Sequence, residues 1–186
     1  MKHLLTILCL TFLFIACQPA PDNSASEAFE ENSKTVLTVL EGFQNENLDH
    51  QAYYATDFVG LVTVFGSDKD SLSLDESIEN DKNNWKFLDF KLLDDPVVLL
   101  PGVNAETKMA DGSVRYYGDW EVTLPATDST EARSGVLKIY SSFDFNEEGK
   151  IINEVGYGDF TGIIRYLMSD DDDDNGDNDD DDATEE

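Results

Sequence analysis

The spacing of apolar positions changes along the chain, from a helical period in the first half to a period of two in the second. Apolar residues between Phe29 and Phe43 recur at helical spacing, with charged residues on the opposite face, and predict an amphipathic helix that ends near Asn47. Ser24 and Glu27 have the spacing of a capping box, which predicts where this helix begins.

Two further elements are expected before the period changes. A short helical segment, residues 48–57, leads into Phe58–Phe65, a run that is apolar on both faces and predicts a covered strand. Ser73 and Glu76 have the spacing of a second capping box, which predicts the start of another helix.

Alternation of apolar and polar residues predicts antiparallel strands from about Phe87 onward. The Gly-containing segment Asn146–Lys150 is typical of a hairpin turn. Helices followed by a meander of strands predict an α+β fold, with the helices wrapped by a curved antiparallel sheet. One expected strand ends near Gly102. Three more are expected over Ser113–Leu124, Val136–Phe145 and Ile151–Phe160.

The N-terminus has the features of a secretory signal. Lys2 and His3 precede the apolar run Leu4–Ala16, which is too short to cross a bilayer but fits a signal peptide over residues 1–16. The segment Phe14–Cys17, "FIAC", resembles the lipobox of bacterial lipoproteins, although Leu is more usual than Phe at its first position. An ordinary signal peptide with an incidental Cys17 is the alternative.

Lipidation of Cys17 would decide where the protein resides. Cys9 leaves with the signal peptide, so the mature chain would have one cysteine and no internal disulfide. Several acyl chains on Cys17 would hold the protein stably in membrane lipid. We therefore expect a lipid-anchored protein of the bacterial cell envelope, at the outer membrane, with residues 17–25 as a flexible tether and a folded domain over residues 26–168.

The charge of the chain excludes one class of partner. Forty carboxylates stand against 12 Lys and Arg, a formal charge of −28, and no basic stripe interrupts them, so we exclude nucleic acid as a partner. The mature chain has one His, His50, which we place on an exposed helical turn. Since no free Cys remains beside His50, we expect neither a metal site nor a cofactor.

The C-terminal residues 169–186 allow two interpretations. Asp171, Asp173, Asn175 and Asp179 have the spacing of a calcium-binding loop. The last position of such a loop is normally Glu and here is Asp182, and no amphipathic helix follows it. We interpret the segment as a disordered acidic tail, because so many like charges repel one another and bury nothing.

Three segments carry a resemblance to a known family. Asn47–Leu61 with Ser73–Asn80, and then Tyr140–Ile163, resemble SnoaL-like proteins of the nuclear transport factor 2-like superfamily, over about residues 26–167. The resemblance implies a cone in which a bent sheet wraps the helices, with a pocket at the wide end. It also implies homodimers formed through the sheet in many members.

Asp159 is the candidate catalytic residue. Strict alternation puts Ile151, Val155, Tyr157 and Asp159 on the inner face of the last strand, where desolvation disfavours a charged carboxylate. In the SnoaL-like cyclases the strand-end Asp is the acid/base, and the resemblance implies that role for Asp159. The alternative is a structural Asp that accepts hydrogen bonds from backbone amides.

The remaining candidates form the wall of the expected pocket. Those cyclases carry a His partner on the middle strand, but Tyr116–Val122 contains none, and Trp120 there is core or pocket wall. Tyr54 and Asp57 could line the pocket with Tyr157 and Asp159. We expect a protein that binds a small apolar ligand or a protein partner without catalysis; the alternatives are an isomerase, cyclase or dehydratase using Asp159, and a purely structural protein.

Overall fold

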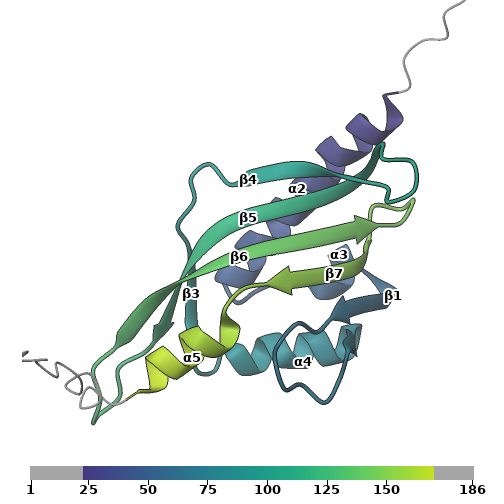
Figure 1. Ribbon diagram of the computed structural model, residues 1–186. Helices are drawn as coiled ribbons and strands as arrows, with labels where there is room; N and C mark the ends of the chain where they lie inside the picture. The colour runs from purple at the N-terminus through teal and green to yellow at the C-terminus, as the bar shows by residue number, and fades with distance from the viewer. Residues whose placement is uncertain (1–22, 170–186) are drawn as a thin grey trace, which may run out of the picture.

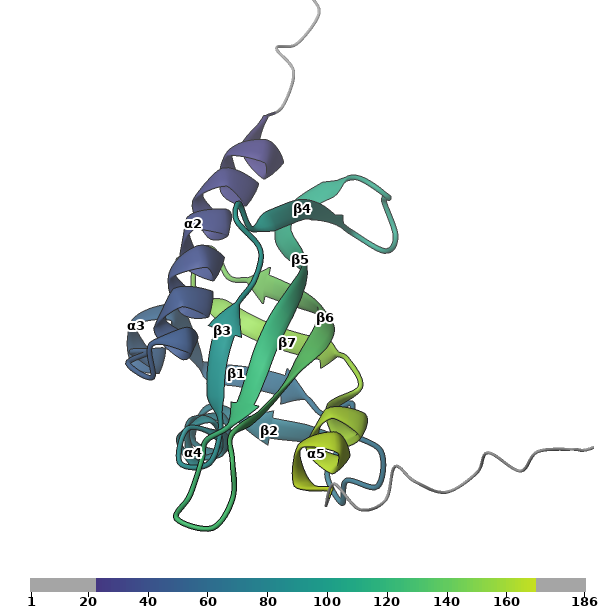
Figure 2. The same cartoon turned by 90° about the vertical axis from the view of Figure 1, so that its left-hand side faces the viewer.

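A seven-stranded sheet bends around the first helix of the domain (Figures 1 and 2). The computed structural model describes residues 23–169. The strands are β1 (Tyr54–Leu61), β2 (Ser71–Ser73), β3 (Asp89–Leu92), β4 (Val98–Val103), β5 (Ala110–Leu124), β6 (Arg133–Phe145) and β7 (Ile151–Tyr157). Their order in the sheet is β2-β1-β7-β6-β5-β3, with β4 also paired to β5.

The predicted α+β fold is confirmed, with one difference in strand direction. β1 and β7 run parallel, whereas the other pairs are antiparallel as expected. A parallel pair needs a long crossover connection, and here the rest of the sheet lies between the two strands in sequence. Local alternation contains no information on that pairing.

The described helices are α2 (Ser24–Gln44), α3 (His50–Tyr53), α4 (Leu74–Asn84) and α5 (Phe160–Met168). The capping box expected at Ser24 is wrong, because Asn23 occupies the N-cap and α2 begins inside the stretch that we assigned to the tether. The box before α4 is confirmed: the Glu76 carboxylate accepts from the backbone N–H of Ser73 at 2.8 Å, and the Ser73 hydroxyl accepts from the Glu76 N–H. The expected strand over Ile151–Phe160 ends early, at Tyr157, and α5 follows.

The interior of the cone is filled by apolar side chains. α2 lies against β5 and buries Val36, Val39 and Leu40, while aromatic rings of β1, β5 and β6 close the space from the sheet side. The buried cluster consists of Val36, Val39, Leu40, Tyr54, Phe58, Leu88, Val114, Tyr116, Trp120, Val122, Leu137, Phe143, Ile151 and Leu167.

Some expectations fall on residues outside 23–169. The expected signal peptide, Cys17 and the acidic segment from residue 170 onward lie outside the described residues. Among the helices within them, none combines the length and apolar composition that a membrane crossing needs.

Candidate functional site

Two hydrogen-bonded pairs lie side by side within the cone. The hydroxyl of Tyr54, in β1, donates to Oε2 of Glu154, in β7, over 2.9 Å. Nε2 of His50, in α3, is 2.8 Å from Oδ2 of Asp81, in α4. The rings of His50 and Tyr54 are 5.8 Å apart between centroids, so the pairs form one unit. We call His50, Tyr54, Asp81 and Glu154 the interior polar cluster.

The imidazole of His50 has an acceptor at each nitrogen. Nδ1 is 3.1 Å from the carbonyl oxygen of Leu48, which can only accept, so Nδ1 carries a proton. Nε2 then either donates to an ionised Asp81 or accepts a proton from a neutral Asp81. In both states a single proton is shared between His50 and Asp81, and this bond ties α3 to α4.

The carboxyl group of Glu154 holds its proton more tightly than an ordinary glutamate does. Burial raises the pKa of Glu154 to about 7, and the negative charge of Asp81 acts in the same direction, while the Tyr54 hydrogen bond and His50 oppose it. Burial also raises the pKa of Tyr54 well above 10, with Glu154 adding to the effect. Near neutral pH Glu154 can therefore hold or release a proton next to a neutral phenol.

A β-bulge turns Glu154 into the cone. Ile151 pairs with Phe145 and Asn153 pairs with Asp144, so β7 advances by two residues where β6 advances by one. Glu154, which strict alternation assigns to the outer face, therefore lies on the same side as Ile151. The expectation that every second residue after Ile151 faces inward is wrong for this reason.

The placement of His50 also corrects an expectation. It was assigned to an exposed turn, but its side chain is only 6% exposed. α3 is a single turn, capped by Asp49, whose side chain accepts from the Ala52 N–H. Because α4 covers that turn and supplies Asp81, His50 is buried by a segment about thirty residues further along the chain.

The predicted pocket residues do not gather at one place. Tyr54 belongs to the interior polar cluster, and Trp120 is 5% exposed in the apolar core, where its ring meets Phe43 edge-on at 5.7 Å. Asp57 is exposed on β1. Tyr157 is 56% exposed on the outer face of the sheet, because the bulge reverses its side as well.

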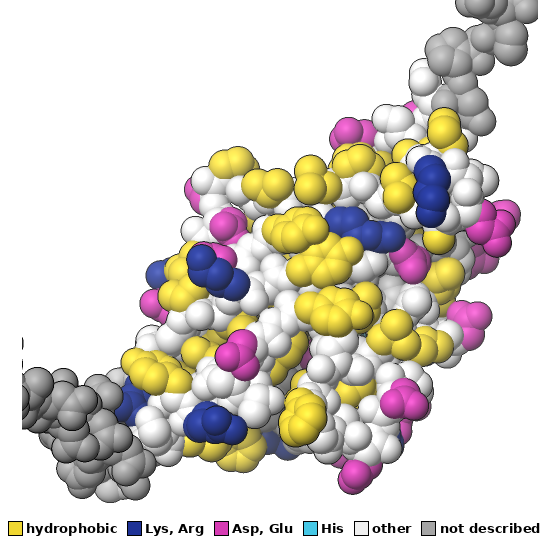
Figure 3. All heavy atoms as spheres, viewed as in Figure 1, with side chains coloured by type: hydrophobic (Ala, Val, Ile, Leu, Met, Phe, Trp, Pro, Cys, Tyr) yellow, Lys and Arg dark blue, Asp and Glu magenta, His cyan; other side chains and the backbone are white. Residues whose placement is uncertain are grey.

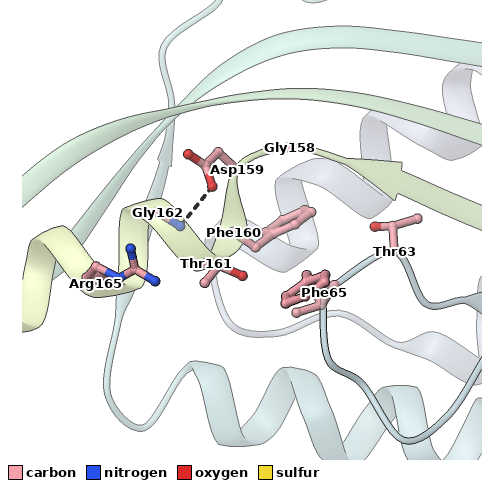
Figure 4. Close-up of a pocket in the computed structure, with 9 residues that line it drawn as sticks. Thr63, Phe65, Gly158, Asp159, Phe160, Thr161, Gly162 and Arg165 are labelled. Carbon is pink, nitrogen blue, oxygen red and sulfur yellow. Dashed lines mark hydrogen bonds between the residues drawn. The ribbon is translucent and has the colours of Figure 1, made fainter.

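Asp159 lies beyond the end of β7 and is exposed, so the expectation of a buried Asp159 is wrong. It is the N-cap of α5, and Oδ1 accepts from the Gly162 N–H over 2.8 Å (Figure 4). Asp159 also lines an open groove of about 360 Å³ between residues 63–65 and the start of α5. Its acid/base role stays a prediction, and the geometry matches the structural alternative.

Removing this cap should weaken the domain modestly. Asp159→Ala should lower the free energy of unfolding by about 1 kcal/mol, because the first turn of α5 loses its side-chain acceptor. Asp159→Asn should be nearly neutral, since Asn caps helices as well as Asp does. Urea denaturation would measure both. Equal losses in the two variants would show that the charge of Asp159, rather than the cap, is what matters.

The described residues contain no group of three or more His, Cys, Asp or Glu side chains placed to hold a metal ion. The interior polar cluster is therefore two acid/base pairs, each satisfied by its own hydrogen bond.

Neither Glu154 nor His50 was among the predicted site residues. Sequence periodicity could not identify Glu154 because the bulge is invisible to it, and α3 is too short to show a period.

Comparison with known proteins supports the fold alone. No protein-family model matches the chain, and no curated protein matches it. Solved structures do match. A putative polyketide cyclase from Xanthomonas campestris pv. campestris superposes with a TM-score of 0.59 at 16% identity, over 76% of this chain and 99% of that chain. A nuclear transport factor 2-like protein from Burkholderia xenovorans superposes with a TM-score of 0.53 at 12% identity, over 74% of this chain and 96% of that chain.

The described domain has the SnoaL-like, nuclear transport factor 2-like fold. An epoxide hydrolase of Mycobacterium tuberculosis matches it too, with a TM-score of 0.52 at 14% identity over 75% of this chain and 90% of that chain. The predicted family likeness is thus confirmed at the level of fold. The SnoaL-like fold hosts different chemistries, so function must be argued from the residues of this chain.

Proposed function

We propose that this protein is a lipid-anchored binding protein of the bacterial cell envelope that associates through the outer face of its sheet and performs no catalysis. One observation carries the proposal. The inside of the cone is occupied by its own aromatic and aliphatic side chains, while the outer face of the sheet presents a row of three tyrosine rings, of which Tyr117 and Tyr157 are more than half exposed. The outer face of the sheet is therefore the surface that favours binding of a partner.

We call Val98, Leu100, Tyr117, Tyr140 and Tyr157 the tyrosine face. Its three tyrosines are register partners on β5, β6 and β7, and successive ring centroids are 4.8 and 6.2 Å apart. Tyr117 is 54% exposed and Val98, its partner on β4, is 53% exposed. Figure 3 shows hydrophobic side chains gathered over these strands. Contiguous exposed aromatics of this kind mark interaction surfaces.

Charge favours a second copy of the chain as the partner. Two molecules of formal charge −28 repel each other over most of their surfaces. The strands of the tyrosine face carry positively charged side chains next to negatively charged ones. A guanidinium nitrogen of Arg115 is 3.3 Å from Oδ1 of Asp144, and Lys138 is the register partner of Asp119. The repulsion is thus smallest there, and a two-fold axis would stack the same aromatic row on itself.

Oligomeric state tests the proposal. The full chain without its lipid should be a dimer by light scattering, and Tyr140→Glu should make it a monomer, because the new carboxylate would be buried without a partner. Phe87→Glu is the matched control, since Phe87 is an exposed aromatic residue off the tyrosine face. A wild-type monomer at all concentrations, or a dimer that survives Tyr140→Glu, would contradict the proposal.

An enzyme is the second candidate, and the specific observation behind it is the Tyr54–Glu154 pair. A carboxyl group with a pKa of about 7 beside a phenol donor suits proton transfer next to a carbonyl, as in an isomerase, cyclase or dehydratase. This moves the expected acid/base from Asp159 to Glu154. Turnover of a carbonyl substrate by the wild type, lost in a folded Glu154→Gln, would establish it.

A further inference from the structure

We propose that α4 is a movable lid over the interior polar cluster, latched to α3 by the His50–Asp81 bond, and that it opens to admit a small uncharged molecule bearing a carbonyl oxygen. This inference does not depend on association through the tyrosine face. It concerns an interior site that is closed in the structure, and it supplies a route by which a ligand could reach Tyr54 and Glu154.

The packing of α4 is the first observation. Of its described residues none is buried, whereas α2 buries four. Residues 62–87 lie between β1 and the buried Leu88 that leads into β3; none of them is buried, and their only strand is β2, three exposed or half-exposed residues at the sheet edge. A segment with so little buried surface opens at a small cost in free energy. Figure 1 shows α4 lying across the end of the molecule near β1.

The two ends of α4 are held differently. Its first turn is fixed by the Ser73–Glu76 capping box and by an ion pair between Lys69 and Glu76, both of them local. Its last turn is held by Asp81, which is 21% exposed and reaches across to the buried His50. The His50–Asp81 bond is thus the polar contact that fixes the C-terminal half of α4 against the body of the domain.

The groups where the lid meets the body of the domain indicate the ligand. The indole N–H of Trp85, at the C-cap of α4, is buried and has no hydrogen-bond partner among the described residues. Its ring lies 6.3 Å from that of His50 and 5.6 Å from that of Phe43. An unpaired buried donor costs about 1–3 kcal/mol, which a ligand oxygen would recover. The interior polar cluster contains two carboxyl groups and no Lys or Arg, so an anion is disfavoured.

Hydrogen exchange measures the opening of the lid. Asp81→Ala should make the amides of α4 exchange roughly 5- to 30-fold faster, because His50 loses its hydrogen-bond partner on α4, while the amides of β5 and β6 keep their rates. Glu79→Gln, on the same helix and exposed, is the matched control and should change neither set. Unchanged exchange in α4 of Asp81→Ala would overturn the proposal, as would a uniform acceleration throughout the domain.

A cross-link provides the second test. A Cβ added to Gly60 would lie 3.3 Å from Oγ of Ser77, so Gly60→Cys/Ser77→Cys, in a chain with Cys9 and Cys17 changed to Ser, should form a disulfide that pins α4 to β1. In the reduced protein, cyclohexanone should shift the indole N–H resonance of Trp85 and leave that of Trp120 unmoved. Oxidation should abolish the Trp85 shift. A shift that persists after oxidation, or none in the reduced form, would overturn the ligand assignment.

Discussion

Glu154→Gln should stabilise the protein at about pH 8 by about 3 kcal/mol. In the folded protein burial raises the pKa of Glu154 to about 7 from 4.5, and a displacement of that size corresponds to about 3 kcal/mol between the two protonation states. Gln has the same shape as the protonated acid, and its carbonyl oxygen can accept the hydroxyl of Tyr54. The variant therefore keeps the hydrogen bond and removes the buried charge.

The sign of the effect sets its pH dependence. A group whose pKa is raised by folding contributes stability that is fully present below the unfolded value, 4.5, and is lost as the pH rises through about 7. The difference in the free energy of unfolding between Glu154→Gln and the wild type should thus be small below pH 4.5. It should grow as the pH rises from 4.5 to about 7 and stay constant at higher pH. Urea denaturation across this range gives the curve.

Glu148→Gln is the matched control for the pH series. Glu148 is exposed in the turn between β6 and β7, so its removal should leave the pH profile of stability unchanged. A Glu154→Gln difference in the free energy of unfolding that did not vary with pH would show that folding leaves the pKa of Glu154 at its ordinary value. Glu154 would then be ionised at neutral pH, and the neutral acid needed for the second candidate function would be absent.

Elements coded by local patterns could be predicted from the sequence. The capping box of Ser73 and Glu76 and the turn at Asn146–Lys150 depend on neighbouring residues alone, and the structure contains both. Alternation correctly placed Tyr116 and Trp120 on one face of β5, because that strand pairs with β6 without interruption. These features are sufficient for the fold class.

The candidate site could not be predicted, because each of its contacts is long-range. One extra residue in β7 reverses which side chains face inward, and its cause is the pairing with β6 rather than any feature of β7 alone. His50 is buried by a helix that follows it in the chain. α5 is different: Phe160, Ile163 and Leu167 recur at helical spacing after Asp159, so the sequence does contain a local signal for this helix, whereas the expected strand extends to Phe160 and no helix is expected after it.

The second large effect concerns the proposed lipid anchor at Cys17, which lies outside the described residues. Cys17→Ser should abolish incorporation of labelled fatty acid and release the protein from the membrane fraction, because lipidation needs the thiol as the nucleophile that forms a thioether. Each buried methylene contributes about 0.8 kcal/mol, so losing two or more chains removes essentially all of the membrane affinity. The acidic domain itself offers little compensating attraction to anionic lipid.

Cys9→Ser separates the anchor from the signal peptide. Cys9 lies within the apolar run that would be removed, so this variant should be labelled and retained in the membrane as the wild type is. Labelling of Cys17→Ser at the wild-type level would contradict lipidation at Cys17. Loss of labelling in both variants would mean that the apolar run tolerates no change, and a Cys17→Ala variant carrying an unrelated cleavable signal peptide would then show whether Cys17 is the acylated residue. Since residues 18–23 extend at most about 20 Å, an acylated Cys17 would hold α2 close to the bilayer and confine any dimer to its surface.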